Sequence, residues 1–105
     1  MIYRVRLVAD AKLQVDELDA WWAENRPRSK VCLSAEVAQA FASLAEMPNR
    51  GTLYKRLRTH DVRQFRLLGT PYALYYVVNE DAAEVVVISA WSGQVGSGPP
   101  LDESL

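Results

Sequence analysis

Apolar and polar residues recur along the chain in patterns that predict one strand, two helices and three further strands. Residues 2–8 (IYRVRLV) alternate apolar and basic, which is typical of a half-buried strand. Residues 10–25 follow a helical period, with Asp10 placed to cap the helix and Pro27 placed to end it. The residues at helical spacing are Val15, Leu18, Trp22 and Asn25, with Trp21 widening the stripe.

A second helix is predicted over about residues 29–47, ended by Pro48 and Gly51. Small residues would form its packing face. That face consists of Val31, Ala35, Ala38, Phe41, Ala42 and Ala45. The break between the two helices is short, so they should form an antiparallel hairpin.

Strands are predicted at about 60–68, 72–79 and 84–91, joined by GTP and NEDAA turns. The last two strands are apolar on both faces. For 84–91, the alternation predicts one face with Val86, Ile88 and Ala90 and another with Val85, Val87 and Trp91. Two helices can cover only one side of this sheet. The other side is either an interaction surface or is closed by Trp91 and the Tyr rings.

These elements predict a single α+β domain over residues 1–105: β-α-α-β-β-β, with a helical hairpin on one face of a small, largely antiparallel sheet and a loose tail at 98–105. The net charge of −1 gives no bulk attraction to nucleic acid or to a membrane, so we expect no direct nucleic-acid binding. The single cysteine and the absence of an N-terminal apolar segment indicate a cytoplasmic protein.

Three stretches carry a resemblance to a known family. They are LDAWWAENRP in the first helix, VRQFRLLGTPYALYYVVNEDAAEVVVISAW in the three strands, and GPPL at 98–101. In this order the chain resembles the RelE/ParE superfamily of bacterial toxins, in its plasmid-stabilisation branch. The resemblance implies the toxin of a type II toxin–antitoxin module, inactivated by an antitoxin. RelE-type members cut messenger RNA on the ribosome, and ParE-type members inhibit DNA gyrase.

The residues expected for RNA cleavage are missing from their usual places. The turn after the basic strand holds Leu68, Gly69 and Pro71 where the resemblance implies Arg or Lys, and Ser92 and Val95 replace the His and Arg that often follow Trp91 in related sequences. RNA cleavage needs a general base, a general acid and cations around one phosphate. We therefore expect no catalytic residues and a ParE-like toxin that acts by binding. A ribonuclease using Arg63, Arg66 and a Tyr is the alternative, as is a degenerate toxin that retains only antitoxin binding.

Positive charge is concentrated between positions 50 and 66, a segment that contains six Lys and Arg residues and one acid, Asp61. This segment suits an acidic partner or a phosphate, or it is a solvated edge that discourages aggregation. The candidate contacts to the antitoxin or the target are Arg56, Arg58, His60, Arg63, Arg66, Tyr75 and Trp91. We expect no cofactor and no metal, and self-association of the free chain into a homodimer.

Overall fold

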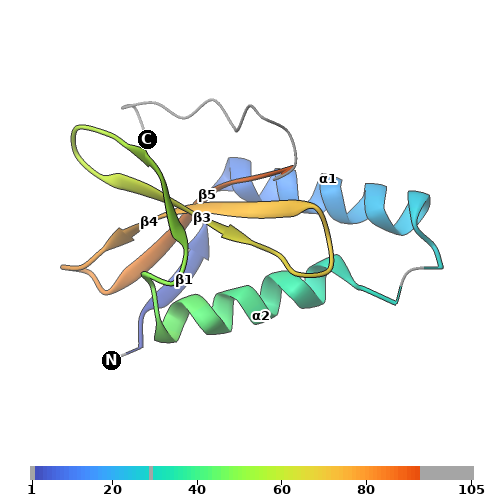
Figure 1. Cartoon of the computed structure of the whole chain (residues 1–105), viewed down its shortest axis with the longest axis horizontal. Helices are drawn as coiled ribbons and strands as arrows, with labels where there is room; N and C mark the ends of the chain where they lie inside the picture. Colours follow the sequence, from blue (N-terminus) through green and yellow to red (C-terminus); the bar gives the residue numbers. More distant parts are fainter. Residues whose placement is uncertain (1, 29, 93–105) are drawn as a thin grey trace.

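The computed structural model describes residues 2–28 and 30–92, which form two helices and one five-stranded sheet (Figure 1). The helices are α1 (Ala9–Asn25) and α2 (Leu33–Glu46). The strands are β1 (Arg4–Leu7), β2 (Thr52–Arg56), β3 (Asp61–Arg66), β4 (Tyr72–Asn79) and β5 (Glu84–Ser92). The predicted α+β class is confirmed, and β2 is an additional strand. The predicted loose tail at 98–105 lies outside the described residues.

The strands lie in the order β1-β5-β4-β3-β2, so β1 and β2 form the two edges of the sheet. β1 runs parallel to β5, with Arg4 opposite Glu84, and the other neighbours are antiparallel. β1 pairs with only the first half of β5. Beyond that point a side chain of α1 provides a hydrogen-bond partner for the β5 backbone. The Oε1 of Gln14 accepts a hydrogen bond of 2.8 Å from the Ala90 backbone N–H.

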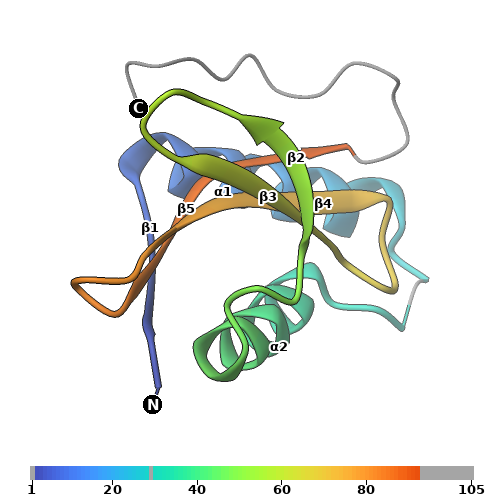
Figure 2. The ribbon, with the colours of Figure 1, turned by 60° about the vertical axis from the view of Figure 1, so that its left-hand side comes forward.

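Both helices pack on the same face of the sheet. Figure 1 shows them running in opposite directions, and Figure 2 shows α2 lying beneath the arch of the strands. Among the described residues, their buried side chains join those of the sheet in one helix-side cluster. It consists of Ala11, Leu33, Val37, Ala40, Leu44, Leu67, Tyr72, Leu74, Tyr76, Val85, Val87 and Ala90. Val15, Leu18 and Trp22 pack against it, which confirms most of the predicted stripe of α1.

Four details of the helix prediction are wrong. α1 has Val8 at its N-cap with no capping side chain, and Asp10 lies inside the first turn. Trp21 is 48% exposed, because the neighbouring Trp22 takes the position that faces the sheet. α2 begins at Leu33, and it buries its larger side chains at Leu33, Val37, Ala40 and Leu44 instead of the predicted small-residue face. Ala35, Ala38 and Ala42 of that face are exposed.

The opposite face of the sheet carries a second, smaller cluster of buried apolar residues. We call it the open-face cluster: Leu57, Val62, Ala73, Tyr75 and Ile88. A bulge in β5 changes which residues reach it, since Tyr75 pairs with Ser89 while Tyr76 pairs with Val87. The extra residue, Ile88, shifts the alternation by one position. Ala90 therefore joins the helix-side cluster, contrary to the sequence prediction.

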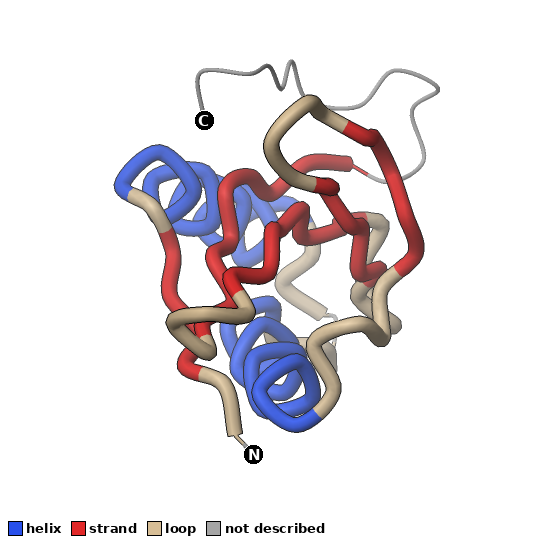
Figure 3. The backbone as a smooth tube through the Cα atoms, turned by 90° about the vertical axis from the view of Figure 1, so that its left-hand side faces the viewer, coloured by secondary structure: helices blue, strands red, loops and turns tan. Residues whose placement is uncertain are grey.

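The β2–β3 hairpin projects away from the helices (Figure 3). Tyr76 fixes its base, because the buried hydroxyl donates to the Pro48 carbonyl at 2.7 Å and accepts from the Gly51 N–H at 2.9 Å. The backbone at Gly51 lies so close that an added Cβ would be 2.6 Å from the Tyr76 Oη. Within the described part of the chain, neither helix is both long and apolar enough to cross a membrane.

Candidate functional site

The strand alternation separates Arg63 and Arg66, which the sequence analysis treated as one group. Arg63 lies opposite Tyr76, whose side chain belongs to the helix-side cluster, and Arg66 lies opposite Ala73, which belongs to the open-face cluster. Directly opposed residues of an antiparallel pair share a face of the sheet. Arg63 and Arg66 therefore project from opposite faces of β3.

Arg63 binds the protein's own backbone. Its Nη1 donates a hydrogen bond of 2.8 Å to the carbonyl of Gly51, the residue whose N–H binds Tyr76. Burial raises the pKa of Tyr76, and the Gly51 N–H and the positive charge of Arg63 partly oppose this rise. Arg63 thus helps to hold the junction between α2 and β2.

The other candidate arginines are exposed. Arg56 and Asp61 form an ion pair across the β2–β3 hairpin, with 3.4 Å between Nε and Oδ1. Solvent screens such a pair, so it contributes little to stability. Arg58 is exposed in the hairpin loop, and Arg66 is exposed at the end of β3. Arg56 and Arg58 thus lie on the same hairpin, and Arg66 lies on the neighbouring open face.

Tyr75 is a packing residue, since only 1% of it is exposed. Its hydroxyl accepts a hydrogen bond of 2.8 Å from Gln64 Nε2. Its ring packs edge-on against Tyr54 of β2, with 4.7 Å between the ring centroids. Trp91 lies opposite Ala73 near the end of β5 and is 36% exposed, so of these two candidate aromatic residues only Trp91 offers a ring to a partner.

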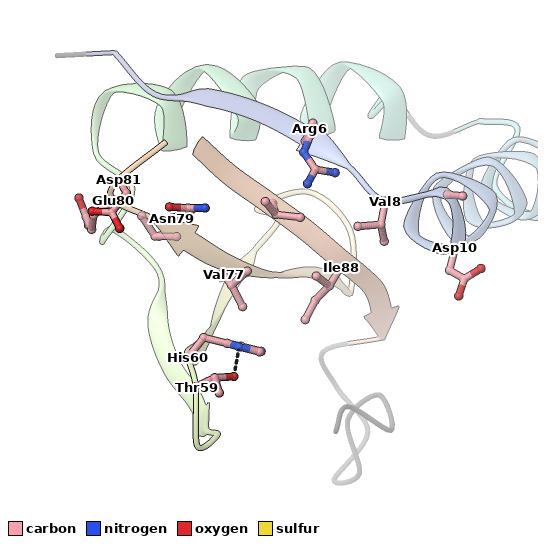
Figure 4. A pocket seen from close by; sticks show the side chains of 13 residues that line it. Arg6, Val8, Asp10, Thr59, His60, Val77, Asn79, Glu80, Asp81 and Ile88 are labelled. Carbon is pink, nitrogen blue, oxygen red and sulfur yellow. Dashed lines mark hydrogen bonds between the residues drawn. The ribbon is translucent and has the colours of Figure 1, made fainter. Parts of the chain in front are cut away.

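A groove of about 700 Å³ crosses the open face (Figure 4). It runs from the start of α1 to the β4–β5 turn, and the tip of the β2–β3 hairpin forms one wall. The apolar residues that line this open-face groove are Val8, Ala9, Val77, Val78, Val86 and Ile88, and the polar ones are Arg6, Asp10, Thr59, His60, Asn79, Glu80 and Asp81.

His60 is the one predicted site residue that lines the groove. Its Nδ1 lies 2.9 Å from the Thr59 hydroxyl, and its Nε2 is buried without a hydrogen-bond partner among the described residues. The other residues of the groove were not predicted from the sequence. Two features of the sequence could have revealed part of it. Arg4 and Arg6 share one face of β1, and Val77 and Val86, which pair in the sheet, are both apolar.

The described residues include no group of three or more His, Cys, Asp or Glu side chains placed to hold a metal ion. Ser92, which stands where a His is often found, ends β5, and Val95 lies outside the described residues.

Comparison with known proteins decides the family. A model of the ParE toxin of the parDE type II toxin–antitoxin system matches residues 5–94. The chain belongs to the ParE toxin family. It is therefore a toxin of a type II toxin–antitoxin system, as the resemblance to RelE/ParE toxins predicted.

Among solved structures, this ParE-family chain is similar to one in the RelBE2 toxin–antitoxin complex from Mycobacterium tuberculosis. The TM-score is 0.58 at 24% sequence identity, and the match covers 86% of this chain and 96% of the other. At this identity the likeness establishes a shared fold. The comparison with curated proteins gave no match.

Proposed function

We propose that this ParE-family chain acts by binding its target and not by its own catalysis. The candidate target is DNA gyrase. We also propose that a cognate antitoxin neutralises it by binding the open face and the β2–β3 hairpin. The family match to ParE toxins supports the choice of target class.

The observation that carries this proposal is the separation of the basic residues on β3. A ribonuclease needs its cations, general acid and general base around one phosphate group. Arg63 projects to the helix side and binds the Gly51 carbonyl, while Arg66 projects to the open face. Tyr75 lies on the open face, but its hydroxyl is already bound by Gln64 in a packed environment. These three residues do not form one catalytic group.

The surface around them suits a protein partner. A contiguous exposed apolar patch often marks a contact surface. Val77 and Val86 line the groove on the open face, Trp91 on the same face is 36% exposed, and Arg56 and Arg58 extend along the neighbouring hairpin. Tyr and Trp rings and Arg side chains are enriched where protein interfaces derive most of their binding energy.

Two experiments test the proposal. The chain is expressed alone and together with the product of its neighbouring gene, and growth is followed. We expect arrest with the chain alone and recovery with both. Purified gyrase is then assayed for supercoiling, which the free chain should inhibit and the neighbouring gene product should restore.

Growth that is unaffected by the chain alone would identify a degenerate toxin. Arrest without any effect on gyrase would contradict the target that we propose and would leave the antitoxin relationship standing. A neighbouring gene product that fails to bind the chain would contradict the antitoxin relationship.

A further inference from the structure

The open-face groove combines an apolar floor with an acidic rim. Val77 and Val86 are half-buried in the floor, and Ile88 is nearly covered. Asp10 marks one end of the groove, where β1 leads into α1. Glu80 and Asp81 mark the other end, in the β4–β5 turn (Figure 4). A ligand that covers this floor must bring apolar side chains, and its charges must suit the rim.

The rim is negative on balance because its carboxylates outnumber its basic residue. Arg6 Nε lies 3.0 Å from Glu84 Oε1, and Arg4 shares this carboxylate at 3.6 Å, so Glu84 offsets only part of the positive charge of the two arginines. Three further carboxylates, those of Asp10, Glu80 and Asp81, line the groove. Glu80 accepts a hydrogen bond from the Tyr3 hydroxyl, which is an uncharged donor. Among the residues that the structure describes, neither Asp10 nor Asp81 forms an ion pair or a side-chain hydrogen bond. Two exposed carboxylates are thus available at opposite ends.

The size and the polar wall of the groove fit a peptide segment. A volume of about 700 Å³ lies within the roughly 300–1,000 Å³ typical of ligand pockets, and several aliphatic side chains fill such a space. His60 Nε2 is buried in the wall without a partner in the described part of the chain. A peptide group or polar side chain of the occupant would supply the missing hydrogen bond.

We propose that the groove receives a segment of the antitoxin in which aliphatic side chains are flanked by Lys or Arg. This inference rests on the proposed antitoxin binding and adds the chemistry of the segment. Basic flanks would pair with Asp10 and Asp81, while the aliphatic side chains cover Val77 and Val86. The antitoxin would then meet two oppositely charged surfaces, since the hairpin carries Lys55, Arg56 and Arg58 against the single acid Asp61 and its positive balance suits an acidic segment. Such charge complementarity fixes the orientation of a partner.

The first test uses peptides as probes. One short peptide of alternating Lys and Leu pairs, blocked at both ends, is compared with the same peptide carrying Glu in place of Lys. Amide chemical shifts of the full chain are followed during titration. We expect the Lys peptide to bind more tightly and to shift the resonances of His60, Val77 and Val86. Tighter binding of the Glu peptide, or shifts that avoid these residues, would overturn the proposal.

Charge reversal gives the second test. Asp10→Lys combined with Asp81→Lys changes two exposed residues, so the fold should persist, which the melting temperature checks. The loss of an exposed ion pair and the new charge repulsion each weaken binding only modestly. For both sites together, we expect the Lys peptide to bind about tenfold more weakly. The matched control is Glu17→Lys combined with Glu24→Lys, which reverses two exposed acids on α1 outside the groove. An equal loss of affinity in the control would show a general charge effect and contradict the site.

The antitoxin itself separates the two proposals. Affinity of the neighbouring gene product is measured for the wild-type chain, the groove variant (Asp10→Lys with Asp81→Lys) and the control. We expect the groove variant alone to bind more weakly. If the antitoxin binds all three equally, the groove is not its site and this inference fails while the proposed function stands. If it binds none of them, the proposed function fails.

Discussion

The two neighbouring tyrosines of β4 should differ sharply in what their hydroxyls contribute to stability. Tyr76 is fully buried, and its hydroxyl joins two buried backbone groups, the Pro48 carbonyl and the Gly51 N–H. Tyr76→Phe keeps the ring and leaves both groups unpaired. Each unpaired buried group costs about 1–3 kcal/mol, so we expect a loss of about 2–4 kcal/mol in the free energy of unfolding. That is a large share of the roughly 5–15 kcal/mol of a typical domain.

Tyr75→Phe is the matched control. Within residues 2–28 and 30–92 its hydroxyl has one partner, Gln64, which is only half-buried and can turn to water. We expect a loss of about 0.5–1.5 kcal/mol. Urea unfolding followed by tryptophan fluorescence measures both variants. If Tyr76→Phe costs no more than Tyr75→Phe, the Tyr76 hydroxyl does not hold the α2–β2 junction and the reasoning is refuted.

Three further predictions concern stability. Trp22→Ala should cost about 3 kcal/mol, because its ring packs against the helix-side cluster and its Nε1 binds the Val31 carbonyl; thermal unfolding measures the loss. Gln14→Ala should cost about 1–3 kcal/mol by leaving the Ala90 N–H unpaired, and faster amide exchange there would show the cause. Burial raises the pKa of Tyr76, so this tyrosine ionises first in the unfolded chain; its contribution to stability should be constant below pH ~10 and be lost above it, as urea unfolding across alkaline pH of the wild type and of Tyr76→Phe would show.

Periodicity predicted the elements whose pattern is long and regular. β4 and β5 were predictable because almost every residue in them is apolar or β-branched, bounded by clear turns. β2 was missed because its five residues include only Leu53 and Tyr54 as apolar positions, between Gly51 and a run of basic residues. Its pairing with β3 and the contact of Tyr54 with Tyr75 stabilise it, and neither is visible locally.

The faces of β5 could not be predicted from alternation alone. The bulge at Ile88 depends on the register with β4, since Tyr75 and Tyr76 pair with residues two apart. After the bulge, Ala90 exchanges faces with respect to a regular strand. The predicted packing face of α2 was also wrong. Small residues recur in α2 at helical spacing, but Leu33 and Leu44 bury a larger apolar area and decide which face packs.

The candidate site was predictable in part. Arg63 and Arg66 are three positions apart, and a period of two already places such residues on opposite faces of a strand. The open-face groove was beyond local analysis, because it joins residues 6–10, 59–60, 77–81 and 86–88. Those segments meet only through the parallel pairing of β1 with β5 and the fold of the β2–β3 hairpin.

Action by binding, without catalysis, is the central claim, and RNA cleavage on translating ribosomes tests it most directly. Purified chain is added to a translation reaction, and messenger RNA ends are mapped by primer extension for the wild type and for Arg66→Ala. We expect no cleavage by either protein, because Arg66 on the open face and Arg63 on the helix side do not share a phosphate. Specific cleavage by the wild type that Arg66→Ala abolishes would contradict this account and establish a ribonuclease.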